Sequence, residues 1–381
     1  MKIQMVDLKG QYEKIKAEVD NGIQEVINNA AFIKGAQVKQ FEEALAIYLN
    51  VKNVISCANG TDALQIAMMV LNLKPGDEII LPAFTYAATA EVICLLGLKP
   101  VLIDVERDTY NMDTSLIEEK ITGRTKAIVP VHLFGQCVNM DEVTAIAAKH
   151  KLYIIEDTAQ ALGSTYTFKN NTKKRAGCIG TIGTTSFFPS KNLGCFGDGG
   201  ALLTNDDELA KKIRMVANHG QSSPYIHDYI GVNSRLDTIQ AAVLLAKLKQ
   251  LKSYEKARNE VADMYDRLLG NHPALCLPKR NTQSTHVFNQ YTLQIHSKNQ
   301  ELKLNRDELR KKLAEAGIPS MVYYPIPLFH QKAFLNPEIQ DNDLPVTFHL
   351  CQAVISLPIH TEMNAQMITY IATTLLKIID A

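Results

Sequence analysis

Short apolar runs alternate with stretches of helical spacing between residues 50 and 204, and this alternation constrains the fold more than any other feature of the chain. Several runs are apolar almost throughout, as expected for strands that are covered on both faces. The predicted strands are 53–57, 78–82, 100–105, 127–132, 152–157, 184–188 and 201–205. Helical spacing lies between them, in 61–73, 87–97 and 140–150. The alternation predicts an α/β fold with a mostly parallel central sheet flanked by helices.

The length of the chain and a change of pattern after residue 233 predict two domains. The chain has 381 residues, whereas single cores stop growing at ~250–300 residues. Residues 233–270 form one long helical pattern that Gly270 closes. We expect a large α/β domain with an N-terminal helical arm over 1–244 and a smaller α+β domain over 245–381. The predicted elements of the smaller domain include a strand at 286–296, an amphipathic helix at 305–318, a proline-punctuated loop at 323–331 and a last helix at 363–379.

Composition and charge argue against several classes of protein. Forty basic residues balance forty acidic ones, so the charge does not favour a nucleic-acid partner, and the one basic cluster, 168–175, is typical of a solvated hairpin turn. Seven cysteines without a CxxC pair favour reduced thiols over a disulfide framework or a zinc site. The chain has no run of 18 apolar residues and no signal-like start. We therefore expect a soluble cytoplasmic protein without a metal or a membrane contact.

Two polar segments follow predicted strands, where open parallel sheets bind their ligands. In "CANGTDAL" (57–64), Gly60 and Thr61 lie at the positive end of a helix, a position that can hold a phosphate. An ordinary helix cap by Asn59 or Thr61 is the alternative. In "LYIIEDTAQ" (152–160), Asp157 ends a buried strand, where a carboxylate is costly unless a cation or hydrogen-bond donors meet it. A capping aspartate for the next helix is the alternative.

A lysine stands in a third segment, "SFFPSKNLG" (186–194), among aromatic and small residues. Lysine ordinarily keeps its amine in water, so Lys191 is either a surface lysine whose stem lies on apolar neighbours or an amine that does chemistry. A lysine, a deep aspartate and a phosphate site built from Gly60, Thr61 and Ser186 together suit a phosphorylated aldehyde cofactor with a basic ring nitrogen. That cofactor is pyridoxal 5'-phosphate. Lys191 would form a Schiff base with it and then carry protons, and Asp157 would keep the ring nitrogen protonated.

Five separated segments resemble one family of enzymes. "NGTDAL", "EDTAQALG", "SFFPSKNLGCFGDGG", "GVNSRLDTIQAA" and "SLPIH" stand in the order found in the DegT/DnrJ/EryC1/StrS sugar-nucleotide aminotransferases. The similarity runs from "VDLKGQY" near the start to residue 360. The resemblance implies an aspartate-aminotransferase-like enzyme of fold type I that depends on pyridoxal phosphate. It also implies L-glutamate as amino donor and a homodimer with shared active sites.

The resemblance also assigns roles to single residues. Lys191 carries the cofactor and Asp157 pairs with its ring nitrogen. Gln160 reaches the ring hydroxyl, and Tyr86 of "AFTYAAT" stacks on the ring. The phosphate is held by Gly60, Thr61, Ser186 and, from the other subunit of the dimer, Asn233.

The sequence is most similar to those members that aminate C3 of UDP-2-acetamido-2-deoxy-3-oxo-D-glucuronate, for surface polysaccharide biosynthesis. In these enzymes the arginine of "NSR", here Arg235, meets the sugar carboxylate, and a bidentate guanidinium suits that partner. A His-Tyr pair that precedes "PIPL" also touches the substrate. This chain has Tyr323 and Tyr324 there, and a phenol brings no positive charge at neutral pH.

Other functions stay open at this point. Because Tyr323 replaces the histidine, an enzyme acting on a dTDP-3-oxo-6-deoxyhexose is the nearest alternative. A dehydratase of the same family would carry histidine in place of Lys191, and a non-catalytic regulator would be expected to lose Lys191 or Asp157. A nicotinamide-dependent dehydrogenase would need GxGxxG after its first strand, which "CANGTD" does not supply.

Overall fold

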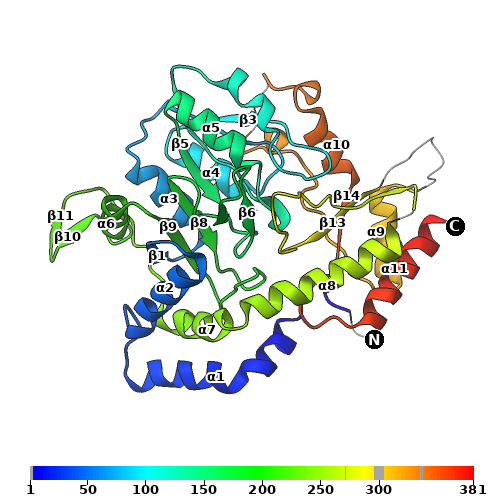
Figure 1. Ribbon diagram of the computed structural model, residues 1–381, viewed down its shortest axis with the longest axis horizontal. Coiled ribbons are helices and arrows are strands. Elements are labelled where there is room, and N and C mark those ends of the chain that lie inside the picture. The colour runs from blue at the N-terminus through cyan, green and yellow to red at the C-terminus, as the bar shows by residue number, and fades with distance from the viewer. Residues whose placement is uncertain (1–2, 271, 296–303, 335, 337) are drawn as a thin grey trace.

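Seven strands form one sheet at the centre of the molecule, in a computed structural model that describes residues 3–270, 272–295, 304–334, 336 and 338–381 (Figure 1). The strand order is β1-β9-β8-β5-β4-β2-β3. β9 runs antiparallel to both of its neighbours, and the other adjacent pairs are parallel. The strands are β1 (Asn53–Cys57), β2 (Glu78–Pro82), β3 (Lys99–Ile103), β4 (Thr125–Ile128), β5 (Tyr153–Asp157), β8 (Ile182–Ser186) and β9 (Gly200–Thr204). Each predicted run overlaps one of them, with starts that differ by up to two residues, so the mostly parallel sheet is confirmed.

Helices cover both faces of this sheet. Successive residues of β2 point to opposite faces, and accordingly Ile79 and Leu81 belong to one buried apolar cluster and Ile80 to another. The first cluster includes residues of α3 (Gly60–Val70), α4 (Ala87–Leu95) and α6 (Asp207–Val216), and the second includes residues of α5 (Met140–His150). Burial on both faces explains why several of the strand segments are apolar almost throughout.

The N-terminal arm consists of α1 (Leu8–Asn28) and α2 (Ala36–Leu49), which both pack against α7 (Thr238–Leu248) along the lower edge of Figure 1. The prediction of one long helical pattern over 233–270 is wrong: residues before 238 lie outside it, and a turn at Lys249–Gln250 separates α7 from α8 (Leu251–Leu269). α7 packs on the core of the large sheet, whereas α8 begins in that core with Leu251 and continues into the core of the C-terminal strands. Leu244 packs with the large sheet, whereas Tyr265 packs with the C-terminal strands. Leucines three to four residues apart continue across the turn, so periodicity alone does not reveal it.

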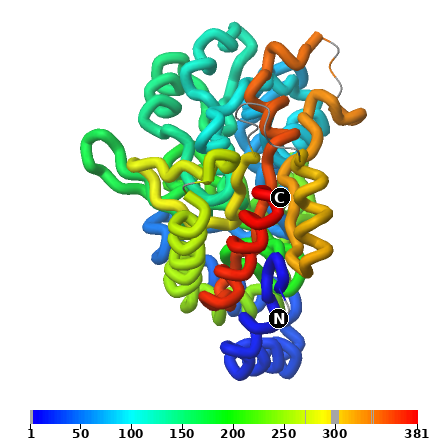
Figure 2. Tube along the Cα trace, turned by 90° about the vertical axis from the view of Figure 1, so that its right-hand side faces the viewer, coloured from blue at the N-terminus to red at the C-terminus, as the bar shows by residue number. Residues whose placement is uncertain are grey.

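A second core lies beside the large sheet and unites the C-terminal elements. β12 (Leu275–Cys276), β13 (Tyr291–Ile295) and β14 (Val354–Leu357) form a three-stranded sheet. α8 and α9 (Arg306–Glu315) both contact α11 (Ala365–Ile379), and Figure 2 shows the three helices side by side. The predicted strand 286–296 thus corresponds to the shorter β13, and residue 296 lies outside the described residues. The expected domain boundary at 244/245 falls within α7 and stays a prediction.

Several shorter elements complete the fold. The basic cluster 168–175 lies in the turn and second strand of the hairpin formed by β6 (Thr165–Thr167) and β7 (Lys173–Arg175). A second hairpin, β10 (Gln221–Ser223) with β11 (Ile226–His227), projects from the left side in Figure 1. α10 (Pro345–Ala353) was not expected from the sequence. The six cysteines at 57, 94, 137, 178, 195 and 351 form no disulfide, and none of the helices described could span a membrane.

Candidate active site

The loop before α3 and the end of β8 approach each other closely. A Cβ placed on Gly60 would lie 2.7 Å from the Cβ of Ser186, and one on Gly200 would lie 2.4 Å from the backbone carbonyl of Asn59. Only glycines permit this approach. Gly60 and Thr61 begin α3, where backbone N–H groups have no partner within the helix. The Asn59 side chain caps the helix by accepting from the N–H of Asp62 at 2.8 Å, so the capping alternative is correct for Asn59.

Asp157 lies at the carboxyl end of β5 and is 8% exposed. Its Oδ1 accepts from the N–H of Ala159 at 3.1 Å, and its Oδ2 accepts from the hydroxyl of Thr89 at 2.9 Å. No cation within the described ranges forms an ion pair with it. The structure therefore holds a buried carboxylate that only neutral donors meet.

Lys191 lies in the loop between β8 and β9, whose turn is closed by a hydrogen bond from its N–H to the carbonyl of Phe188 at 2.8 Å. Burial lowers the pKa of the Lys191 amine, and the charge of Asp157 acts in the opposite direction. The amine and the carboxylate are thus within electrostatic reach of each other. The amine forms no hydrogen bond or ion pair in the part of the chain that the structure describes. An unpaired amine with a lowered pKa is suited to nucleophilic chemistry.

Gln160 and Tyr324 connect two distant parts of the chain beside Asp157. The Gln160 Oε1 accepts from the N–H of Phe134 at 2.8 Å, and its Nε2 donates to the Tyr324 hydroxyl at 3.2 Å. The Tyr324 ring lies 6.1 Å from the exposed ring of Tyr86 and 5.9 Å from that of Phe84, measured between centroids. Burial raises the pKa of the Tyr324 phenol, which stays neutral. Tyr323, whose phenol pKa is also raised by burial, packs on Tyr324 at 6.1 Å.

The segment 233–235 is only partly joined to this cluster. Ser234 is buried, and its hydroxyl accepts from the N–H of Ala58 at 3.0 Å, which fastens the segment to the loop before α3. Asn233 is exposed, and its backbone forms an isolated antiparallel β-bridge with Asn218. Arg235 is partly buried, and no hydrogen bond or ion pair engages its side chain within the residues described. The single chain therefore does not bring Asn233 or Arg235 into contact with Lys191 or Asp157.

Sequence reasoning missed two residues of the site. Thr89 was overlooked because a threonine in a helix has no distinctive pattern, although it stands three residues after Tyr86 and so on the same face of α4. Ser234 was overlooked because "GVNSR" drew attention to its charged and amide members. The only available signal was its position between two predicted site residues.

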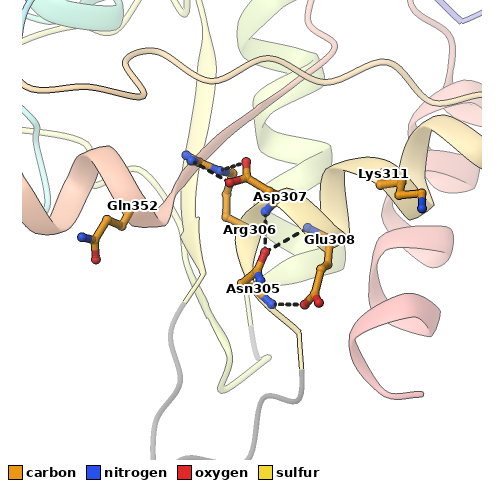
Figure 3. A pocket seen from close by; sticks show the side chains of 6 residues that line it. All are labelled: Asn305, Arg306, Asp307, Glu308, Lys311 and Gln352. Atoms are coloured by element: carbon orange, nitrogen blue, oxygen red, sulfur yellow. Dashed lines mark hydrogen bonds and ion pairs between the residues drawn. The ribbon is translucent and has the colours of Figure 1, made fainter. Parts of the chain in front are cut away.

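A pocket elsewhere on the surface does not compete with this site (Figure 3). It lies at the start of α9, where Asn305 and Glu308 form a reciprocal helix cap. Arg306 donates to the carbonyls of Cys351 and Val354. Four of the polar side chains that line it, Asn305, Arg306, Asp307 and Glu308, are thus engaged with the protein itself. No cluster of three His, Cys, Asp or Glu side chains that could hold a metal occurs in the described ranges.

The cluster fits pyridoxal phosphate on its own chemistry. It offers an unpaired amine, a buried carboxylate without a cation, and a helix start where a side chain on Gly60 would fill the space beside Ser186. These are the groups that an aldehyde, a ring nitrogen and a phosphate require.

The comparison with known proteins agrees with this fit. Residues 13–376 match the sequence pattern of the DegT/DnrJ/EryC1/StrS aminotransferase family. The chain belongs to this family. It is therefore an aminotransferase that depends on pyridoxal phosphate, and the prediction of family, fold type and cofactor is confirmed.

Individual relatives match nearly the whole chain. The UDP-2-acetamido-2-deoxy-3-oxo-D-glucuronate aminotransferase of Pseudomonas aeruginosa is 45% identical over 98% of this chain and 99% of its own. The UDP-N-acetyl-3-dehydro-alpha-D-glucosamine 3-aminotransferase of Acidithiobacillus ferrooxidans is 41% identical over 98% and 97%. The crystal structure of S. venezuelae DesV, in complex with a ketimine intermediate, superimposes with a TM-score of 0.93 at 34% identity, covering 100% of this chain and 99% of the other.

Proposed function

We propose that this enzyme transfers the amino group of L-glutamate to C3 of UDP-2-acetamido-2-deoxy-3-oxo-D-glucuronate. The observation that carries the proposal is the 45% identity, over 98% of the chain, to an aminotransferase named for that substrate. The reaction would take place in the cytoplasm, and six cysteines that form no disulfide support a reducing compartment. We also propose that the chain divides into a large domain over 1–244 and a small domain over 245–381.

Each residue of the cluster would have its own role in cofactor binding or catalysis. Pyridoxal phosphate, when bound, supplies an electron sink for negative charge at the carbon that bears the nitrogen. Lys191 would hold the cofactor and move the proton at that carbon, and the lowered pKa of its amine supports such a role. Asp157 would face the ring nitrogen, Gln160 the ring hydroxyl and Tyr86 the ring itself. The phosphate would be bound by Gly60, Thr61, Ser186 and the partner subunit's Asn233.

We propose that the active enzyme is a homodimer in which each site takes Asn233 and Arg235 from the opposite chain. Apolar side chains beside these residues support an interface. Tyr225, in the turn of the β10–β11 hairpin, is 92% exposed, and Ile230, which follows the hairpin, is 88% exposed; both would leave apolar surface in water. The connection between α1 and α2 lies next to the residues that follow Arg235, because the N–H of Thr238 donates to the carbonyl of Phe32. Phe32 is itself exposed. Exposed apolar side chains on both segments would be buried in the dimer.

The shared site can be tested by mixing inactive variants. Lys191→Ala removes the amine from one site, and Asn233→Asp places a negative charge beside the phosphate. Neither variant is active alone, but a hybrid dimer has one intact site, so mixing restores up to a quarter of wild-type activity on statistical grounds. Absence of any rescue, once native mass spectrometry confirms that subunits exchange, contradicts the shared site.

Arg235 provides the test of the substrate. Truncating one partner of a desolvated charge pair costs ~2–5 kcal/mol, because the other charge stays buried and unpaired. Arg235→Leu should therefore lower kcat/KM for the uronate more than tenfold, since each ~1.4 kcal/mol is a factor of ten. An acceptor with a methyl group at C6 has no charge to lose and should change much less. An equal loss for both acceptors would mean that Arg235 only braces its loop.

A dTDP-3-oxo-6-deoxyhexose is the second candidate acceptor. The observation that favours it is Tyr323, a neutral phenol where the uronate enzymes carry histidine. Wild-type kcat/KM for the two acceptors separates these candidates directly.

A further inference from the structure

Asp157 is held by a side chain from a different layer of the fold. Thr89 is 1% exposed and lies on α4, and its hydroxyl donates to Asp157 Oδ2 at 2.9 Å. The other carboxylate oxygen accepts from the N–H of Ala159 at 3.1 Å. Each oxygen therefore has one fixed donor, and together the two donors set the plane of the carboxylate. A carboxylate offers about four lone-pair positions, so acceptor capacity remains for a further partner.

The Thr89 hydroxyl has a competing use that it does not take. Threonine in a helix commonly turns its hydroxyl to a carbonyl three or four residues earlier. Here its hydrogen goes to Asp157, across the space between α4 and β5. Tyr86 precedes α4 and stands three residues before Thr89. The N-terminal end of α4 thus carries both the ring that borders the site, at its N-cap, and the donor that fixes the carboxylate, in its first turn.

We propose that Thr89 is a positioning residue that holds the Asp157 carboxylate toward the ring nitrogen of the cofactor. The inference rests on the proposed function, in which Asp157 pairs with that nitrogen. Without the hydroxyl, Asp157 keeps only the donor from Ala159 and can rotate about its side-chain bonds. The interaction with the ring nitrogen then weakens, and the electronic state of the bound cofactor changes with it.

The test compares two substitutions at Thr89 with a matched control. Thr89→Val keeps the shape and removes the hydroxyl, whereas Thr89→Ser keeps the hydroxyl. Thr347→Val is the control, because Thr347 also donates to a buried aspartate, Asp104, at 2.7 Å outside the candidate site. The readouts are kcat with L-glutamate and the pH midpoint of the visible absorption of the cofactor-loaded protein.

We expect Thr89→Val to shift the absorption midpoint by at least half a pH unit and to lower kcat about tenfold, which is ~1.4 kcal/mol in the barrier. Thr89→Ser should restore both to near wild type, and Thr347→Val should change neither even if it lowers thermal stability. An unchanged midpoint in Thr89→Val, or an equal shift in Thr347→Val, overturns the inference.

Asp157→Asn distinguishes this failure from failure of the proposed function. If Asp157→Asn abolishes activity and alters the absorption while Thr89→Val does neither, Asp157 faces the cofactor without help from Thr89. If Asp157→Asn itself leaves the absorption unchanged, the pairing with the ring nitrogen is wrong and the inference about Thr89 is wrong with it.

Discussion

Replacement of Gly60 by alanine tests the closeness of the loop before α3 to the end of β8. The new Cβ would lie 2.7 Å from the Ser186 Cβ, 0.7 Å inside the 3.4 Å at which ordinary contact begins, and 3.3 Å from the Ser186 Cα. The two elements must separate, and overpacking of this kind costs ~1–3 kcal/mol. Alanine regains up to ~1 kcal/mol of helix preference. We expect the free energy of unfolding to fall by about 1–2 kcal/mol and cofactor affinity to fall at least tenfold.

Urea unfolding followed by circular dichroism measures the first effect, and titration with pyridoxal phosphate measures the second. Ser186→Gly removes the atom that the new Cβ meets, so the double variant should recover stability, with a coupling energy above ~0.5 kcal/mol for residues in contact. Gly123→Ala is the control, because a Cβ there would meet nothing within 4 Å. If Gly60→Ala unfolds and binds cofactor as wild type does, the close approach is wrong.

Two further predictions concern stability. Burial lowers the pKa of Lys247, which is 1% exposed, from 10.5 to about 8. Since the unfolded chain binds more protons between pH 8 and 10.5, wild type should gain about 3 kcal/mol over Lys247→Met across that range, at 1.36 kcal/mol per unit; a constant difference in urea unfolding would refute this. Asp104 is buried and accepts from the N–H groups of Val346 and Thr347 at 2.8 Å, which fastens the start of α10 to the end of β3. Asp104→Asn turns an amide toward these donors and should lower the free energy of unfolding by about 2 kcal/mol at neutral pH, whereas an unchanged urea midpoint would mean that α10 is held by its apolar face alone.

The central sheet could be predicted because its signal is local and physical. A strand covered on both faces is largely apolar, and β2, with Ile79 and Ile80 in different cores, is of this kind. The turn between α7 and α8 could not be predicted, because it depends on how the two helices pack against two different cores. α10 was missed for a similar reason: its start is fixed by Asp104, far away in sequence.

Some residues of the candidate site could likewise be predicted from the sequence, and others could not. Lys191 stands out as a lysine among aromatic and small residues, and Asp157 as a carboxylate at the end of a buried strand. Gly60, at a helix start, and Ser186, at a strand end, are residues that suit a phosphate. Thr89 and Ser234 act through one hydrogen bond each, to partners 68 and 176 residues away. Nothing in the sequence marks those pairings, and only the packing of α4 on the sheet and of the 233–235 segment on the loop before α3 creates them.

The central claim is that Lys191 is the residue that holds the cofactor, and chemical trapping tests it most directly. Borohydride reduction of the cofactor-loaded enzyme makes the bond between the cofactor and its lysine irreversible. Mass spectrometry of the proteolytic peptides then identifies the modified lysine. We predict that the pyridoxyl group is found on the peptide that contains Lys191 and is absent from Lys191→Ala treated in the same way. Modification of Lys247, which is buried in the described structure, or an enzyme that turns over with Lys191 unmodified, would contradict the account.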